Sequence, residues 1–351
     1  MNRTSEDYFY VEDMIAVKMS DVARLANVSP ATVSRVLRQP ELVSEETRVK
    51  VLKVVEELNY QPHMIARQFR TRETKTILVI VPDISRVFFS EVLRGIQHMA
   101  VSHGYKVILG DSENDLQREK EFIDLVLQKQ ADGVVLLTAR MELASLERIS
   151  NQFPMVIACE YFDGSDVPTV SIDNISSSRK IMEHLIHLGH TEIAHITGPM
   201  DVILSRDRLK GYRQALMSHE IEVKPEFIQE GDFSVQSGYD QMIKLLSLQR
   251  PPTAVFVFND EMALGAIKAV KKSGKRVPED IAVVGFDNIN IASFFDPEIT
   301  TIDQPKYEIG QVAMDLLLKL MNGERLERTK IVLPDELIVR ESCGSNIVKL
   351  R

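Results

Sequence analysis

The chain has 351 residues, of which 44% are hydrophobic and 26% are charged, and its formal net charge is −9. This length and composition fit two or three globular domains and exclude a disordered or fibrous protein. No apolar run approaches the roughly 18 residues that a membrane helix needs, and the acidic N-terminus lacks the apolar stretch of a secretory signal. Because there are only two cysteines, Cys159 and Cys343, we expect no disulfide framework and a cytoplasmic location.

The charge is distributed unevenly along the chain. Residues 14–76 hold 11 Lys and Arg against 7 Asp and Glu, a net charge of +4, and residues 1–13 have a net charge of −3, which leaves −10 for residues 77–351. The overall acidity argues against a nucleic-acid partner, because phosphate binding needs clustered Lys and Arg. A basic head before an acidic body instead favours a nucleic-acid-binding module at the head.

Residues 18–61 predict three short helices, preceded by an N-terminal extension (residues 1–17) of no assigned role. The first helix runs to Leu25, and Val22, Ala23 and Leu25 are expected to face a core. Ser29 is a good N-cap and Pro30 a good first residue for a second helix that continues to residue 37. Ser44 caps a third helix, whose expected buried stripe comprises Val51, Leu52, Val54, Val55 and Leu58. Three short helices in this order are typical of a helix-turn-helix domain.

Residues 62–74 are predicted to form a hinge helix and a linker. Within them, residues 63–72 place Ile65, Ala66 and Phe69 at helical spacing among three arginines. The segment is too short to be stable alone, so we expect it to be helical only with a partner.

From Thr76 onward, apolar runs of strand length alternate with amphipathic stretches. The expected strands are residues 77–81, 107–109, 134–137, 155–158, 193–196, 254–258 and 281–285. The expected helices are residues 89–103, 116–130, 176–188, 207–219, 235–246, 259–273 and 307–321. Continuous apolar strands joined by helices predict an α/β fold of doubly wound parallel sheets with both faces covered.

This pattern runs about twice the length of one such sheet and changes its rhythm near residues 169–173 and 300–305. We therefore expect two lobes: residues 75–171 with 304–325, and residues 172–303 with 326–343. Two short final strands, near residues 331–333 and 337–339, are expected to lie one in each lobe. Ligands of this architecture bind at the carboxyl ends of the strands, in the cleft between the lobes.

Several motifs resemble the lactose/galactose repressor family from residue 18 to about residue 343. In the head they are residues 19–23 (MSDVA), 28–37 (VSPATVSRVL), 43–48 (VSEETR) and 58–62 (LNYQP). In the body they include residues 94–96 (RGI), 208–212 (RLKGY), 263–266 (ALGA) and 277–287 (VPEDIAVVGFD). The resemblance implies a helix-turn-helix head, a body like a periplasmic binding protein, and a repressor that binds a near-palindromic operator as a homodimer under the control of a small molecule.

Four stretches look most like the branch of this family that responds to cytidine. They are residues 76–84 (TILVIVPDI), 88–91 (FFSE), 122–125 (FIDL) and 307–310 (YEIG). This likeness suggests a nucleoside as effector. Residues that line the cleft decide the ligand, so a sugar also remains open.

The second helix of the head is the expected recognition helix. Such a helix needs small polar and basic side chains at its N-terminal end, where they reach base edges and phosphates. The resemblance implies that its first two residues read bases, and Pro30 and Ala31 offer apolar contact with a thymine methyl. It also implies that Phe69 wedges into the minor groove, whereas packing of Phe69 under the body is the alternative. The expected DNA-binding residues are Ser29, Pro30, Ala31, Thr32, Ser34, Arg35, Asn59, Tyr60 and Phe69.

For the cleft, the resemblance implies that Arg208, Asp287, Asn259 and Asp260 hold a polar effector, with Phe88 and Phe89 as an apolar wall. A guanidinium and a carboxylate can bracket the vicinal hydroxyls of a sugar or ribose, and an aromatic ring can stack on a base. The alternatives are a salt bridge between the lobes for Arg208 and Asp287, and a place in the core for the two phenylalanines.

We expect no enzyme and no cofactor. The chain has no glycine-rich phosphate loop, no Gly-x-Ser-x-Gly elbow and no His-Glu-x-x-His motif. His190 and His195 flank a strand but lack further partners at ligand spacing, so no metal site is expected. Two other functions stay open: a solute-binding protein of transport, which the basic head disfavours, and a catabolite regulator controlled by a sugar or a protein corepressor.

Overall fold

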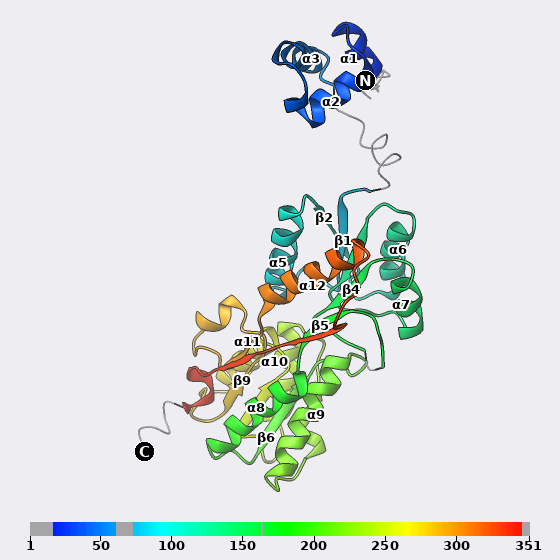
Figure 1. Cartoon of the computed structure of the whole chain (residues 1–351). Coiled ribbons are helices and arrows are strands. Elements are labelled where there is room, and N and C mark those ends of the chain that lie inside the picture. Colours follow the sequence, from blue (N-terminus) through cyan, green and yellow to red (C-terminus); the bar gives the residue numbers. More distant parts are fainter. Residues whose placement is uncertain (1–16, 61–72, 163, 346–351) are drawn as a thin grey trace, which may run out of the picture. The chain divides into compact units, whose positions relative to one another are not determined.

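The computed structural model describes residues 17–60, 73–162 and 164–345, which fall into two compact units on either side of the boundary between Glu73 and Thr74 (Figure 1). The first unit, the head, consists of α1 (Met19–Leu25), α2 (Pro30–Arg38) and α3 (Glu45–Glu57), with a short 3-10 helix, η1 (Pro40–Leu42), before α3. The three helices begin and end close to where the sequence predicted them. The hinge helix expected at residues 63–72 and the extension before residue 17 lie outside the described residues.

A small apolar core holds the head together. It comprises Val22, Ala23, Ala26, Val33, Val36, Val51, Val54 and Tyr60. Two predicted core residues were wrong, because Leu25 is 57% exposed and Leu52 is 45% exposed. Leu52 directly follows the buried Val51, and one residue turns a helix by about 100°, so such short helices bury only a narrow stripe.

The second unit, the body, contains two parallel sheets. The first is six-stranded, in the order β11 (Lys330–Leu333), β5 (Thr169–Ile172), β4 (Met155–Ala158), β3 (Gly133–Leu136), β1 (Thr76–Val81) and β2 (Lys106–Asp111). All its neighbouring strands are parallel. We call the part of the body built on this sheet the first lobe.

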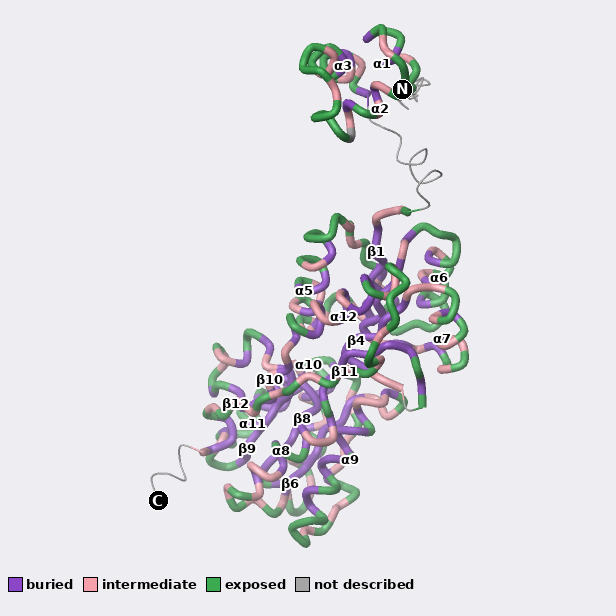
Figure 2. The backbone as a smooth tube through the Cα atoms, viewed as in Figure 1, coloured by how far each residue is buried: buried purple, intermediate pink, exposed green. Residues whose placement is uncertain are grey.

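Alternate residues of β1 enter the cores on opposite faces of this sheet. Ile77, Val79 and Val81 pack with residues of α5 (Phe88–Ser102) and α12 (Lys306–Met321). Leu78 and Ile80 pack with residues of α6 (Leu116–Leu127) and α7 (Leu143–Ser150). Because both faces are covered, the central strands β1, β3 and β4 are buried along their whole length, and Figure 2 shows them between helices whose outer surfaces are exposed.

The second lobe is built on a four-stranded parallel sheet. Its order is β7 (Ile228–Glu230), β6 (Ile193–Thr197), β8 (Ala254–Val257) and β9 (Ala282–Val284). It is covered by α8 (Asn174–His187) and α9 (Ile203–Ser218) on one face, and by α10 (Val235–Leu246) and α11 (Asp260–Lys272) on the other. This mixed α/β architecture of doubly wound parallel sheets is the predicted fold class.

The chain passes between the lobes three times: after β5, between β10 (Thr301–Asp303) and α12, and between β11 and β12 (Glu336–Ile338). β10 and β12 form an antiparallel pair beside the second sheet. The lobe boundary expected at residue 326 is wrong for residues 330–333, because their backbone pairs with β5 in the first sheet.

Four elements were not predicted from the sequence: α7, β5, β7 and β10. They are short or carry polar residues at half their positions.

Two glycines bring α5 and α12 into close contact. A Cβ at Gly95 would lie 2.1 Å from the carbonyl oxygen of Tyr307, and a Cβ at Gly310 would lie 2.0 Å from that of Val92. Only glycine permits so close an approach of two helix backbones.

Among the helices of the described residues, none is long and apolar enough to cross a membrane.

Candidate functional site

The expected DNA-reading residues gather at the N-terminal half of α2. Ser29 is its N-cap, and the Ser29 Oγ accepts a hydrogen bond from the backbone N–H of Thr32 over 3.1 Å. Pro30, Ala31 and Arg35 are exposed, and Thr32 and Ser34 are half-buried. The exposed residues present one continuous surface along the start of this helix.

Arg35 differs from neighbouring basic residues of the head in having no partner. Arg24 pairs with Asp21 at 3.3 Å and Lys53 with Glu57 at 3.8 Å. Within the described part of the chain, the exposed Arg35 forms no ion pair or side-chain hydrogen bond. Its guanidinium is therefore available to an external acceptor.

The last three expected DNA-binding residues differ in how the structure places them. Asn59 is exposed just beyond α3, with a left-handed φ of 45°. Tyr60 is only 5% exposed and belongs to the head core, so the structure gives it a packing role that the sequence analysis did not predict. Phe69 lies outside the described residues.

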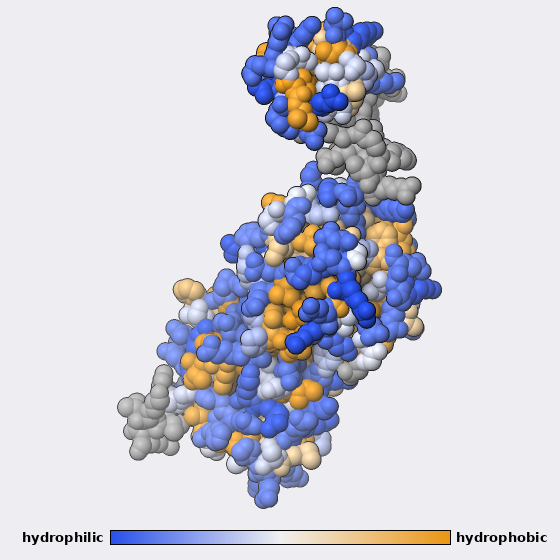
Figure 3. Space-filling view, viewed as in Figure 1, coloured by the Kyte–Doolittle hydropathy of each residue, from blue (hydrophilic) through white to orange (hydrophobic). Residues whose placement is uncertain are grey.

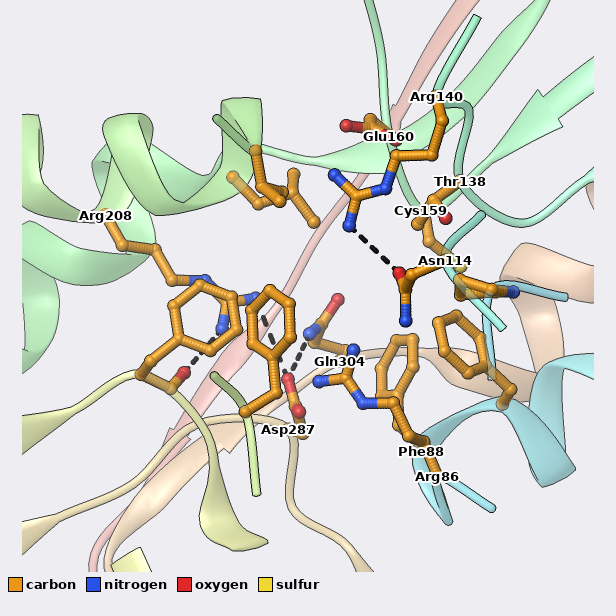
Figure 4. Close-up of a pocket in the computed structure, with 16 residues that line it drawn as sticks. Arg86, Phe88, Asn114, Thr138, Arg140, Cys159, Glu160, Arg208, Asp287 and Gln304 are labelled. Carbon is orange, nitrogen blue, oxygen red and sulfur yellow. Dashed lines mark hydrogen bonds and ion pairs between the residues drawn. The ribbon is translucent and has the colours of Figure 1, made fainter. Parts of the chain in front are cut away.

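The body contains a cleft between the lobes, at the carboxyl ends of the strands of both sheets (Figure 4). Its space is about 580 Å³ when the open mouth is counted. The lining residues are Pro82, Arg86, Phe88, Phe89, Asn114, Thr138, Arg140, Cys159, Glu160, Val202, Leu204, Arg208, Phe233, Phe258, Asp287 and Gln304. Four of the six expected effector residues are among them.

Arg208 and Asp287 form a buried polar pair on the wall that the second lobe provides. The Arg208 Nη2 lies 3.7 Å from the Asp287 Oδ1, and the Arg208 Nη1 donates to the carbonyl oxygen of Phe258. Gln304 donates to the same Asp287 oxygen over 2.7 Å. Burial lowers the pKa of Arg208 to about 10 and raises the pKa of Asp287. Both residues belong to the second lobe, so the salt bridge between lobes considered from the sequence is not what they form.

Aromatic rings supply the apolar part of the cleft. Phe88 and Phe89 contact edge to face with centroids 5.2 Å apart, and Phe89 also belongs to the core of the first lobe. Facing them from the second lobe, Phe233 and Phe258 have centroids 4.9 Å apart. The cleft thus has ring faces on both lobes.

Asn259 and Asp260 do not line the cleft, although both follow β8 as expected. The Asn259 Oδ1 caps α11 by accepting from the N–H of Met262 over 2.8 Å. Asp260 is fully buried, and its Oδ2 accepts from the N–H of Ile289 over 2.9 Å. Burial, with the nearby Asp287 charge, raises the pKa of Asp260 to about 8. The structure therefore gives both residues a supporting role beneath the site.

Two arginines of the cleft were missed. Arg86, in the loop after β1, stacks over the Phe233 ring, with its guanidinium carbon 4.2 Å from the ring centroid. Arg140, after β3, donates from Nη2 to the Asn114 Oδ1 over 2.9 Å, and its Nη1 lies 3.5 Å from the Asp201 carboxylate of the second lobe. Figure 4 shows the two guanidinium groups reaching into the pocket from different sides.

Cys159 and Glu160 directly follow β4 and also line the pocket; from the sequence, Cys159 could line the cleft or be a small buried hydrophobe, and Glu160 was missed. Glu160 accepts from the N–H of Ala139 over 3.0 Å, and burial raises its pKa to about 7. Burial raises the pKa of Cys159 far above its usual range. The position of these residues at a strand end was the signal that could have identified them.

The backbone is strained at several pocket residues. Asn114, Cys159, Phe233 and Asp287 have φ values of 59°, 69°, 78° and 106°. Non-glycine residues rarely adopt this left-handed region, and they cluster where a ligand is held. The strain agrees with a site whose shape is fixed before a ligand arrives.

The histidines considered for a metal have structural surroundings. His195 is buried and stacks on Phe256 with ring centroids 4.3 Å apart, and burial lowers its pKa to about 3. Within the described ranges, no group of three His, Cys, Asp or Glu side chains is arranged to hold a metal ion.

Comparisons with known proteins cover nearly the whole chain. Residues 18–63 match the model "Bacterial regulatory proteins, lacI family", and residues 182–343 match "Periplasmic binding protein-like domain". The chain is 46% identical over 328 residues to the HTH-type transcriptional repressor CytR of Escherichia coli (strain K12), which covers 93% of this chain and 96% of that protein. It is 37% identical to catabolite control protein A of Priestia megaterium, over 93% of this chain and 99% of that protein.

Solved structures give the same result. The lac repressor dimer bound to operator and the anti-inducer ONPF superimposes with a TM-score of 0.84 at 31% identity, over 93% of this chain and 99% of that one. A complex of the transcriptional regulator CelR with cellobiose has a TM-score of 0.72 at 31% identity, over 93% and 99% of the two chains. These similarities confirm the resemblance that the motifs indicated.

Proposed function

Because the chain belongs to the LacI family of bacterial regulatory proteins, and is thus a ligand-responsive DNA-binding transcriptional repressor rather than an enzyme, we propose that its effector is a nucleoside or a sugar bound in the cleft. The main observation in support of this proposal is the buried pair of Arg208 and Asp287, which lies between aromatic walls. A guanidinium donates to hydroxyl oxygens and a carboxylate accepts from hydroxyl groups, so together they fit vicinal hydroxyls.

The rings distinguish the two ligand classes. A nucleobase buries its faces against aromatic side chains, and the cleft offers Phe88 on the first lobe, while Arg86 already lies over the Phe233 ring of the second lobe. A sugar packs only its C–H faces on such rings and leaves more hydroxyls to be satisfied. The number of aromatic residues therefore favours the nucleoside, in agreement with the similarity to CytR.

The proposed DNA contacts are made by the start of α2, with Asn59 nearby and Phe69 at the wedge position. A single head of this size buries too little surface for high affinity, whereas two recognition helices on a near-palindromic operator double the contacts. We propose that the protein acts as a homodimer in the cytoplasm.

The flank of the first lobe is the proposed dimer surface. Val101 on α5 is 61% exposed, and Ile108 and Leu109 on the neighbouring edge strand β2 are also exposed. Figure 3 shows several apolar patches among polar residues on one face of the body. A monomer that binds operator tightly at micromolar concentration would contradict this part of the proposal.

Effector control follows from the contacts that close the cleft. A ligand held by both lobes favours the closed body by the difference of its affinities for the closed and open forms. The lobe angle then sets the spacing between the two heads of the dimer, and with it the population competent to bind DNA.

A thermal-unfolding screen of the full chain with nucleosides and with neutral sugars tests the effector class. A ligand at 100 times its Kd stabilises the folded protein by about 2.7 kcal/mol and raises the Tm by several degrees. We expect at least one nucleoside to do so. No increase with any nucleoside or sugar would contradict the proposal, and an increase with sugars alone would favour the sugar-controlled alternative.

Asp287→Ala tests the site itself. We expect loss of the ligand-induced shift, with operator binding retained in the absence of ligand. Asp296→Ala is the matched control, because the side chain of Asp296 is 95% exposed on the same lobe. A full ligand response in Asp287→Ala would refute the assignment.

A further inference from the structure

We propose that the effector carries an anionic group, a phosphomonoester on the nucleoside or sugar, and that Arg86 binds it with help from Arg140. This inference rests on the proposed function of the same cleft and specifies the chemistry of its ligand. It concerns the wall opposite the pair of Arg208 and Asp287.

Arg86 is a cation in the cleft that has no salt-bridge partner among the described residues. Its Nε is completely buried, and no protein atom accepts a hydrogen bond from it. Across the described residues, the side chain forms no ion pair at all, and its contacts are the faces of the Phe233 and Phe89 rings. Burial lowers the pKa of Arg86, the charges of Asp287, Glu261 and Asp83 raise it, and the charge of Arg140 lowers it.

Arg86 lies over the Phe233 ring and has a buried Nε–H that no protein atom accepts. A guanidinium that lies flat on a ring uses its face, while its N–H groups point outward in the plane. That edge is the one that binds phosphate or carboxylate oxygens in a bidentate manner. In Figure 4 the guanidinium of Arg86 extends to the middle of the pocket, close to Gln304, where a ligand would lie.

Arg140 is a second arginine of the pocket whose hydrogen-bond donors are not all used. Its Nε is also buried without a partner, while its two terminal nitrogens contact Asn114 and the exposed Asp201. Two buried, unsatisfied Nε groups in one pocket cost free energy that an incoming acceptor would recover.

The charge balance of the cleft favours an anion over a neutral acceptor. Arg86, Arg140 and Arg208 all line it, and each affects the electrostatics of another. The acidic lining residues are Asp287, which is paired with Arg208, and Glu160, whose pKa burial raises to about 7. Outside the lining, the charges of Glu261 and Asp83 also act on Arg86. A carbonyl or hydroxyl oxygen would satisfy the hydrogen bonds of Arg86 but would leave it without an ion pair.

These placements give the ligand an orientation. The hydroxyls of the sugar ring lie against Arg208 and Asp287, the apolar face lies against Phe88, and the phosphate lies at Arg86. A nucleoside 5′-monophosphate and a hexose phosphate share this arrangement, so the experiment includes both.

The test compares each neutral compound with its phosphorylated form on the full chain by calorimetry: the four ribonucleosides against their 5′-monophosphates, and glucose against glucose 6-phosphate. We expect at least one phosphorylated form to bind tenfold or more tightly than its neutral partner. Arg86→Gln keeps hydrogen-bonding capacity but removes the charge, and we expect it to abolish this preference. Arg250→Gln, at an exposed position of the second lobe, removes the same net charge outside the cleft and should preserve it.

Unliganded operator binding and thermal unfolding of each variant establish that it is folded. Equal binding of the neutral and phosphorylated forms, or a preference that persists in Arg86→Gln, overturns this inference and leaves the proposed function intact. The absence of binding by every compound, neutral or phosphorylated, overturns the proposed function as well. Preference for a nucleotide over the hexose phosphate, or the reverse, identifies the source of the phosphate.

Discussion

Tyr161 of the first lobe donates a hydrogen bond to the carboxylate of Asp207 in the second lobe, over 2.6 Å. Tyr161 follows β4, and Asp207 lies on α9. The bond therefore exists only while the two lobes are close together, and it stabilises the closed form of the cleft.

We predict that Tyr161→Phe weakens ligand binding by about tenfold, because a hydrogen bond to a charged group contributes about 1.5 to 3 kcal/mol and only the closed form benefits from it. Calorimetry with a ligand from the thermal screen measures the change. Tyr239→Phe is the control, since the Tyr239 hydroxyl forms no hydrogen bond among the described residues. Equal effects of the two variants would show that the interlobe bond does not favour closure.

The buried carboxyl of Asp260 predicts a pH dependence of stability. Its pKa is raised to about 8 in the folded protein, against about 3.9 when unfolded. Between these values the folded state binds more protons than the unfolded state, so stability falls as pH rises and becomes constant above about pH 8.

Asp260→Asn mimics the protonated form and removes this dependence. We predict that the stability of the variant relative to the natural protein increases by about 1 kcal/mol per pH unit between pH 6 and pH 8. Urea unfolding at several pH values measures it, with Asp296→Asn as the exposed control. A constant difference between the two proteins would mean that Asp260 is ionised throughout this range.

Arg35→Gln is expected to weaken operator binding and to reduce its salt dependence. An exposed arginine on the recognition helix without an internal partner is available to a phosphate or a base edge. Loss of one phosphate contact lowers the slope of log K against log salt by about one. Filter binding at several salt concentrations measures both quantities, and Lys53→Gln on α3 controls for net charge. An unchanged slope with weaker binding would instead indicate a base contact, and unchanged affinity would remove Arg35 from the interface.

Gly310→Ala is expected to destabilise the first lobe by about 1 to 3 kcal/mol, the usual cost of overpacking. The new Cβ would lie 2.0 Å from the Val92 carbonyl oxygen, so α5 and α12 must move apart. Thermal unfolding measures the effect, with Gln97→Ala on the exposed side of α5 as control. A Tm as high as that of the control would show that these helices separate at no cost.

The sequence was sufficient to predict the order of helices and strands in the body, because strands buried on both faces are continuous apolar runs. It was not sufficient for β5 and β7, where Thr, Ser, Gln and Glu interrupt the pattern. The partner of β11 was also unpredictable, since backbone pairing across more than a hundred residues leaves no local signal.

Site residues that belong to a sequence motif were predicted, whereas residues that come together only through the fold were missed. Arg208 and Asp287 came from the family resemblance. Arg86, Arg140 and Phe233 lie in three separate loops and meet only when the two sheets face each other across the cleft. The resemblance also implied Asn259 and Asp260, which lie beneath the cleft and do not line it, because a motif does not reveal whether a side chain turns outward or caps the helix that follows.

The pairing of β11 with β5 has a consequence for the order in which the protein is completed during synthesis. The second sheet, from β6 to β9, is contiguous in sequence, so it can assemble as soon as residue 284 leaves the ribosome. The first sheet begins earlier but must wait for Leu333. Until then the backbone N–H and C=O groups of β5 form an open edge, which is where another strand can attach. The sheet that is started first is therefore finished last, and its unfinished edge is the point at which a nascent or shortened chain would aggregate.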